Sequence, residues 1–218
     1  MLKVCLNKSM NDAEKITEIE NIIQSQNLEK IFEAVSLALS IQDDEDRDLY
    51  LLDTIRWLIK NEIWQKAYGA AQLMSESYEK SQALQEVADY LASVGHLEKA
   101  LMIFTEAEKV STAESLAEWQ KAELLHNIAK CLRRAKAFFK ADEIWEKAIV
   151  IARKGEDSPS FQDSEDSSSV LAEIAEYLAS EEKIEKALSI GREIESIDKR
   201  ERVLQQIAAY SQQIKRVA

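Results

Sequence analysis

A pair of short apolar patterns, held at a constant separation, recurs along this chain of 218 residues. Four segments carry mostly apolar residues at positions i, i+3, i+4 and i+7, and an alanine follows twelve residues after each i+4 position. The paired residues are Ile55 and Ala67, Ala88 and Ala100, Ala129 and Ala141, and Ala175 and Ala187. Ile55 and Ala88 are 33 residues apart, and the next two intervals lengthen to 41 and 46 residues. A constant internal offset within units of variable spacing indicates a structural repeat.

The repeat predicts pairs of α-helices. Residues at i, i+3, i+4 and i+7 form one apolar stripe on a helix, and an alanine within the stripe lets a second helix approach closely. One pair buries only part of its apolar surface, so successive pairs are expected to stack. The chain has 4 Gly and 1 Pro, and it lacks the alternating pattern of strands. We therefore expect an all-α fold. The expected helices span 46–60, 63–77, 80–93, 97–110, 114–134, 137–154, 167–180, 184–196 and 199–215.

The best-formed unit runs Leu84, Val87, Ala88, Leu91, Gly95, Ala100, Phe104 and Ala107. This pattern resembles the tetratricopeptide repeat (TPR) family, whose repeat has about 34 residues. The family's first Trp, its Tyr and its closing Pro are missing from every unit, and Gly191 stands where Phe104 and Trp145 stand. The resemblance implies a right-handed α-solenoid of about five TPR-like helix hairpins plus a C-terminal capping helix. In that family the first helix of each pair lines a concave groove.

The resemblance covers residues 14–218, which we expect to form a single solenoid domain after a flexible segment at 1–13. Residues 14–41 form a degenerate first pair in this interpretation. The insertion near 111–121 has no helix breaker, so we expect it to lengthen the flanking helices. The acidic, Ser-rich segment at 155–169 contains the one proline and predicts a mobile surface loop. A phosphorylation site or an acidic ligand is the functional alternative for that loop.

Charge and cysteine content exclude several classes of partner. The formal net charge of −12, from 40 acidic and 28 basic residues, argues against nucleic acid and against an anionic membrane surface. Cys5 and Cys131 lie far apart with no Cys/His cluster, which predicts no disulfide, no metal and no cofactor. The N-terminus lacks a signal peptide pattern, and no 18-residue apolar run occurs. We expect a cytoplasmic protein.

The predicted inner face of the first helices carries several cations, although the chain is acidic overall. By helical spacing, the candidate partner-binding residues are Arg56, Lys60, His126, Lys130, Arg133 and Arg134, and Asn127 is adjacent to them. Such a groove suits an acidic peptide or a C-terminal carboxylate, because Arg and Lys bind carboxylates. The alternative is that these are ordinary solvated charges balanced by nearby acids.

No phosphate-binding loop, nucleophile elbow or metalloprotease motif occurs in the sequence, so we expect no enzyme. The leading hypothesis is a scaffold or adaptor that binds a partner peptide or segment in the concave groove. One alternative is a structural protein that forms a homodimer or larger homo-oligomer through an apolar N-terminal face. Its residues are Ile16, Ile19, Ile23, Leu49, Leu52 and Ile59. A second alternative is a regulatory sensor that binds a small ligand.

Overall fold

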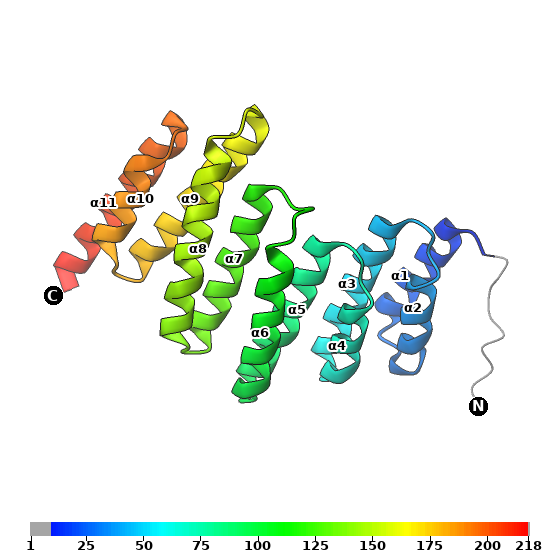
Figure 1. Ribbon diagram of the computed structural model, residues 1–218. Coiled ribbons are helices and arrows are strands. Elements are labelled where there is room, and N and C mark those ends of the chain that lie inside the picture. Colours follow the sequence, from blue (N-terminus) through cyan, green and yellow to red (C-terminus); the bar gives the residue numbers. More distant parts are fainter. Residues whose placement is uncertain (1–9, 218) are drawn as a thin grey trace. The chain divides into compact units, whose positions relative to one another are not determined.

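The computed structural model describes residues 10–217 (Figure 1). The regular structure of these residues is entirely helical, as the repeat predicted. The helices are α1 (Asp12–Ser25), η1, a 3₁₀ turn (Leu28–Lys30), α2 (Ile31–Ala38), α3 (Asp44–Lys60), α4 (Trp64–Gln72), α5 (Ser77–Ser93), α6 (Leu97–Ser111), α7 (Glu118–Arg134), α8 (Phe138–Glu156), α9 (Phe161–Ser180), α10 (Ile184–Glu193) and α11 (Ile197–Val217). Residues 1–9 of the predicted flexible segment lie outside the described residues, whereas 12 and 13 begin α1.

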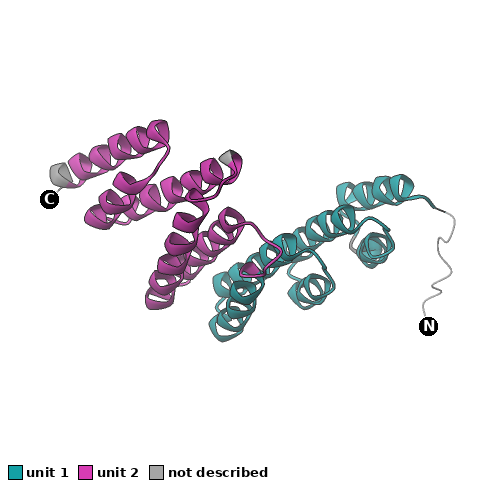
Figure 2. Cartoon of the chain, turned by 45° about the horizontal axis from the view of Figure 1, so that its top comes forward, with its two compact units in different colours: residues 1–110 teal, residues 111–218 magenta. Residues whose placement is uncertain are grey.

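Contacts divide the chain into two compact units, Met1–Val110 and Ser111–Ala218, where we expected one domain over 14–218 (Figure 2). Within unit 1, α1 packs on α2 and α3 packs on α4, and α3 also contacts both α1 and α5. Within unit 2, α7 packs on α8 and α9 on α10, and α9 also contacts α7 and α11. In both units, therefore, the first helix of a hairpin contacts its own partner and the first helix of the next hairpin.

The residue pairs that define the twelve-residue offset lie at the centre of each hairpin. All eight of these residues are completely buried, and Ile19 and Ile31 form a fifth buried pair at the same offset in α1 and α2. Most of the second members are alanines, and a methyl side chain lets two helix backbones approach closely at their crossing point. The degenerate first hairpin therefore uses the same contact as the others, with two isoleucines in place of alanines.

The two helices of each hairpin are joined by the same turn. A residue with left-handed backbone stands seven positions after the first member of each pair. These residues are Gln26 (φ 51°), Glu62 (φ 64°), Gly95 (φ 88°), Lys136 (φ 61°) and Glu182 (φ 64°). In four of the turns the next amide donates back to a helix carbonyl, as from His96 N to Leu91 O at 2.8 Å. This hydrogen bond satisfies a carbonyl at the helix end, as in a Schellman cap.

The two insertions lengthen helices more than loops. α6 has 15 residues against 9 in α4, so this helix is lengthened as expected. Residues 112–117, however, form a loop where a helix was predicted from 114 onward. The loop predicted at 155–169 is reduced to residues 157–160, because α8 continues to Glu156 and α9 begins at Phe161. Ser167 and Ser168 are buried, and Ser168 Oγ donates to Glu156 Oε1 at 2.5 Å. Packing of these serines against α8 outweighs their weak helix propensity.

Gly191 departs from the repeat for a reason that the packing explains. It occupies the position of Phe104 and Trp145, whose aromatic rings are buried in their own hairpins. A Cβ atom at Gly191 would lie 3.2–3.4 Å from side-chain atoms of α11, the nearest being in Leu204. The side chains of α11 therefore fill the volume that an aromatic ring fills in the hairpins of Phe104 and Trp145.

A buried polar residue in the first helix binds the loop that leaves the second helix. Asp48 is completely buried in α3, and its Oδ2 accepts from the backbone amides of Ser75 and Glu76 at 2.6 Å. Asp12 holds the equivalent place in the first hairpin, where its Oδ2 accepts from Gln42 N at 3.0 Å. Both carboxylates thus satisfy amide groups at the start of the next hairpin, a region where helix N–H groups lack backbone partners.

Exchanging the residues at two of the left-handed positions tests the turn. Glu62 makes no side-chain contact that a replacement would lose, so Glu62→Gly should raise the free energy of unfolding by about 0.5–1 kcal/mol. Gly95→Glu should lower it by a similar amount, because a Cβ atom disfavours positive φ. Urea denaturation measures the change in the free energy of unfolding for both variants. An unchanged free energy in Gly95→Glu would contradict the assignment of the turn.

Two helical glycines should respond oppositely to alanine. At Gly69 in α4 an added Cβ atom meets nothing within 4 Å, so Gly69→Ala should stabilise the protein by about 0.5–1 kcal/mol. At Gly155 in α8 an added Cβ atom would overlap the Ser167 side chain, so Gly155→Ala should destabilise by about 1–3 kcal/mol. Thermal denaturation of both variants tests this prediction through their melting temperatures. Equal shifts of the two melting temperatures would show that α8 and α9 do not pack this closely.

Candidate functional site

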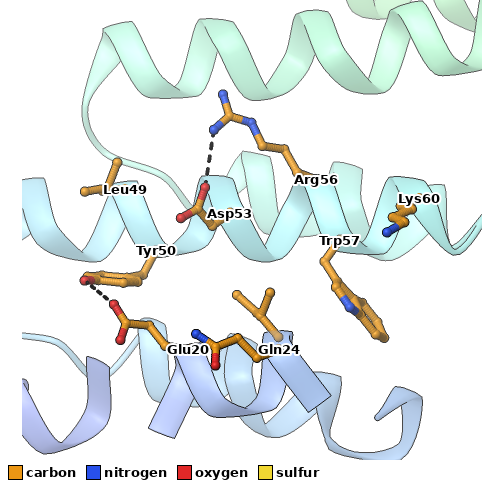
Figure 3. A pocket seen from close by; sticks show the side chains of 9 residues that line it. Glu20, Gln24, Leu49, Tyr50, Asp53, Arg56, Trp57 and Lys60 are labelled. Atoms are coloured by element: carbon orange, nitrogen blue, oxygen red, sulfur yellow. Dashed lines mark hydrogen bonds and ion pairs between the residues drawn. The ribbon is translucent and has the colours of Figure 1, made fainter. Parts of the chain in front are cut away.

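An open groove of about 530 Å³ lies between α1 and α3 in unit 1 (Figure 3). The residues that line it are Glu20, Ile23 and Gln24 from α1 and Leu49, Tyr50, Asp53, Arg56, Trp57 and Lys60 from α3. The α3 residues recur at the spacing of one helix face, and so do the three α1 residues. We refer to this surface as the α1–α3 groove.

The α1–α3 groove contains part of the apolar face predicted near the N-terminus. Leu49 is 47% exposed and Ile23 is half-buried, and both line the groove. Ile19 and Leu52, which we placed on the same face, are buried in the core instead. Fewer of the predicted apolar side chains are therefore available on this face than expected. Trp57 also lines the groove, although only 6% of that residue is exposed.

Arg56 is held by carboxylates on two sides. Its Nε donates to Glu86 Oε1 at 2.9 Å, and its Nη1 donates to Asp53 Oδ1 at 3.3 Å. The hydrogen bond to Glu86 raises the pKa of Arg56 further above its usual range, despite the opposing effect of burial. Two carboxylates thus balance the one guanidinium, which matches the alternative that this cation is part of a surface ion-pair network.

The opposite wall of the α1–α3 groove is acidic. Tyr50 donates from its hydroxyl to Glu20 Oε1 at 3.4 Å, a long hydrogen bond between α3 and α1. Burial raises the pKa of Tyr50, and the negative charge of Glu20 raises it further. Figure 3 shows Glu20 and Gln24 on α1 facing the α3 side of the groove, with the bonds to Tyr50 and from Arg56 to Asp53 marked.

Three polar groups of the α1–α3 groove have no protein partner among residues 10–217. These are the Lys60 ammonium, the Trp57 indole N–H and the Gln24 side-chain amide. Trp57 is an efficient recognition residue, because its ring contributes a large apolar area and its N–H seeks an acceptor. The groove therefore offers two donors, from Trp57 and Lys60, beside the apolar side chains of Ile23 and Leu49.

The other five predicted residues lie on α7 in unit 2, whereas Arg56 and Lys60 lie on α3 in unit 1. His126 was predicted on the exposed inner face, and this was wrong, since only 1% of it is exposed. Its Nδ1 accepts from Trp145 Nε1 at 3.1 Å, so the ring belongs to the α7–α8 core. Burial lowers the pKa of His126 to about 3, with a smaller contribution from the positive charge of Lys130. The histidine is therefore neutral at pH 7.

The other α7 residues are partly engaged within unit 2. Arg133 Nε donates to Glu181 Oε2 at 2.6 Å, and its guanidinium lies 4.5 Å from the centre of the Phe138 ring. Arg134 is exposed, and its Nη2 lies 3.1 Å from Cys131 Sγ. Lys130 and Asn127 are half-buried, so neither is fully available on the surface.

Sequence reasoning missed Glu20, Gln24, Tyr50, Asp53 and Trp57 as members of the groove. The spacing from Leu49 to Lys60 carries the signal for the α3 residues, because these positions share one helix face. The α1 residues could not be paired with α3 in the same way, since the first hairpin departs from the repeat pattern. Acidic residues are abundant along the chain, so the sequence alone does not single out Glu20 or Asp53.

Two features are absent from the part of the chain that the structure describes, a metal-binding cluster and a membrane-spanning helix. No group of three or more His, Cys, Asp or Glu side chains there is placed to hold a metal ion. None of the helices there is both long and apolar enough to cross a membrane.

No protein-family model and no curated protein sequence matches the chain. In structure, the chain is similar to the crystal structure of Ton1535 from Thermococcus onnurineus NA1, with a TM-score of 0.57 and 19% sequence identity. The similarity covers 89% of this chain and 57% of that chain. At this identity the similarity extends to the fold alone.

The buried His126 predicts a specific loss of stability in mild acid. In the unfolded chain histidine binds a proton near pH 6.5, whereas in the folded chain it does so only near pH 3. The unfolded state therefore holds more protons between these values, and the free energy of unfolding falls as pH decreases, by about 1.4 kcal/mol per pH unit from this group.

Urea denaturation from pH 7 to pH 4 measures this loss in wild type and in His126→Gln. The glutamine can still accept from the Trp145 N–H but does not titrate, so its curve should be shallower. His96→Gln, at an exposed histidine, should follow wild type. Parallel curves for wild type and His126→Gln would contradict a buried neutral His126.

Proposed function

We propose that both units are built from TPR-like helix hairpins of one α-solenoid, about five in number, with α11 as the terminal capping helix. The constant twelve-residue offset, its complete burial in five hairpins and the shared left-handed turn support this proposal. So do the contacts between the first helices of successive hairpins, such as α3 with α5 and α7 with α9. A stack of this kind leaves one face of its first helices available for binding.

The function that follows is that of a protein-binding module, a scaffold or adaptor that holds a segment of another protein in the α1–α3 groove. The observation that carries it is the combination of exposed Leu49 with the unpartnered donors of Trp57 and Lys60. An apolar side chain of the partner packs against Leu49 and Ile23. A carbonyl or carboxylate oxygen accepts from the Trp57 N–H and the Lys60 ammonium.

The chemistry of the groove favours recognition over catalysis. Its titratable side chains are Glu20, Tyr50, Asp53, Arg56 and Lys60. Arg56 pairs with Asp53 and Glu86, whereas Lys60 forms no ion pair with residues 10–217. Lys60 therefore favours a partner segment with an acidic group, as the sequence hypothesis had it. The proposal includes no enzymatic activity, no cofactor and no nucleic acid, and it places the protein in the cytoplasm.

A second copy of the chain is the alternative occupant, because Leu49 and Trp57 would also serve a self-association surface. This alternative predicts a mass that rises with concentration in light scattering. A constant monomer mass would leave the groove to a different protein.

Substitutions in the α1–α3 groove test the binding proposal. Leu49→Glu and Lys60→Glu change exposed side chains, so both variants should fold as wild type does. Each should weaken capture of a partner about 10-fold or more, because one loses apolar contact and the other reverses the charge that meets an acidic group. Quantitative affinity capture, followed by titration of the captured protein, measures the effect.

The matched control is Leu73→Glu, which changes another exposed leucine (57% exposed) that does not line the groove. Its capture should equal that of wild type. Equal losses for Leu49→Glu and Leu73→Glu would move the binding site away from the groove. Loss only in an Arg133→Glu/Arg134→Glu variant would place the site on α7 in unit 2.

A further inference from the structure

A second, smaller pocket of about 310 Å³ lies in unit 2, among residues of α7, α9 and α11. Its lining residues are His126, Lys130, Glu173, Glu176, Tyr177, Ser180 and Tyr210. The volume is at the lower end of the range for pockets that bind small molecules. Two aromatic rings and several charged groups surround a space that is open to solvent, and we call it the α7–α9 pocket.

His126 presents a hydrogen-bond donor to this pocket. The Trp145 indole nitrogen can only donate, so His126 Nδ1, which receives that bond, carries no proton. Because the ring is neutral, its single proton is on Nε2, at the edge of the ring away from Trp145. Among the described residues His126 hydrogen-bonds to Trp145 through Nδ1, and the same side chain borders the pocket. The result is a fixed N–H donor on a side chain that is 99% buried and held by the core.

Two opposite charges at the α7–α9 pocket lack an ion-pair partner in the described chain. Glu173 makes no hydrogen bond or ion pair, and burial raises its pKa, followed by the negative charges of Glu123 and Glu176. Lys130 makes no ion pair either, and its ammonium lies 6.0 Å from the centre of the Tyr177 ring. Glu176 differs, because Arg202 lies 3.8 Å from its carboxylate.

Glu173, on α9, and Lys130, on α7, both line the pocket, and their opposite charges interact although they form no ion pair. The positive charge of Lys130 lowers the pKa of Glu173, yet the two groups are not within ion-pair distance. A space between an unpaired carboxylate and an unpaired ammonium is complementary to a ligand with both charges in the reverse order. The Nε2–H of His126 adds a donor for the negative end of such a ligand.

We propose that the α7–α9 pocket binds a small zwitterion with the charge pattern of a free α-amino acid. Its ammonium group pairs with Glu173, and its carboxylate accepts from the Lys130 ammonium and from His126 Nε2–H. Tyr177 and Tyr210 flank the site and contact the ligand's side chain. This site lies wholly in unit 2, so it is independent of partner binding at the α1–α3 groove.

Nuclear magnetic resonance titration of the full chain with L-alanine tests the proposal. Two probes are compared with it. L-Alaninamide keeps the ammonium and lacks the carboxylate, and N-acetyl-L-alanine keeps the carboxylate and lacks the ammonium. We expect a saturable shift of the His126 imidazole ¹⁵N resonances with L-alanine, and binding about 10-fold or more weaker for each analogue, since each loses a charge-assisted hydrogen bond.

Variants assign the charges within the site. Glu173→Gln should weaken L-alanine binding about 10-fold and leave N-acetyl-L-alanine binding unchanged, and Lys130→Gln should weaken L-alanine without affecting L-alaninamide. Both positions are at least partly exposed, so these variants should fold. Glu201→Gln, at an exposed glutamate of α11 outside the pocket, is the matched control and should bind as wild type does.

Three outcomes would overturn the proposal. One is the absence of a saturable shift at His126 with L-alanine. Another is equal affinity for the three probes, which would show that the site does not recognise the ammonium and the carboxylate of the ligand at the same time. The third is unchanged L-alanine binding in Glu173→Gln, which would place the ligand elsewhere. None of these outcomes bears on capture of a partner by the α1–α3 groove.

Discussion

The contact between two buried residues twelve positions apart is the interaction on which each hairpin depends. Small side chains such as Ala88 and Ala100 bring the two helix backbones together, and the apolar stripes on either side then pack at interior density. The left-handed turn between them follows from this constraint, because a connection as short as 61–63 or 94–96 must reverse the direction of the chain. The position of the turn is so strongly fixed that Glu62, Lys136 and Glu182 adopt a conformation that usually favours glycine.

The repeat made most of the helices predictable, because periodicity and offset depend only on local sequence. α5 and α6, for example, match the expected segments 80–93 and 97–110 to within three residues at each end. Composition failed at 155–169, where serines and acids suggested a loop. The deciding interactions there are tertiary: Gly155 lies against Ser167, and Ser168 binds Glu156 across two helices. Such contacts override propensity and are not visible in a linear pattern.

For the candidate sites, too, helical spacing predicted which helix face a residue occupies but not how buried it is or which partners it has. Helical spacing placed Arg56 and Lys60 on one face of α3, and both residues line the α1–α3 groove. Spacing could not show that Glu86, on the next first helix, engages Arg56. Nor could it show that Trp145 draws His126 into the core, since that partner comes from a different helix. The charge of a residue can be predicted from the sequence, but whether that charge remains available depends on partners that lie on other helices, 30 residues away for Arg56 and 19 for His126.

The buried Asp48 carboxylate has a consequence for how unit 1 opens. The loop after α4 is short and would ordinarily exchange its amide hydrogens quickly, as connections do. Ser75 and Glu76, however, donate their amides to a carboxylate that belongs to α3. Separating them would remove two amide donors from a buried carboxylate and leave it only the more distant Arg47 Nε, 3.6 Å from Oδ1, which costs more than breaking an exposed turn. The loop and the first turn of α5 are thereby joined to α3 as one cooperative unit, and their amides exchange only when that helix itself comes apart.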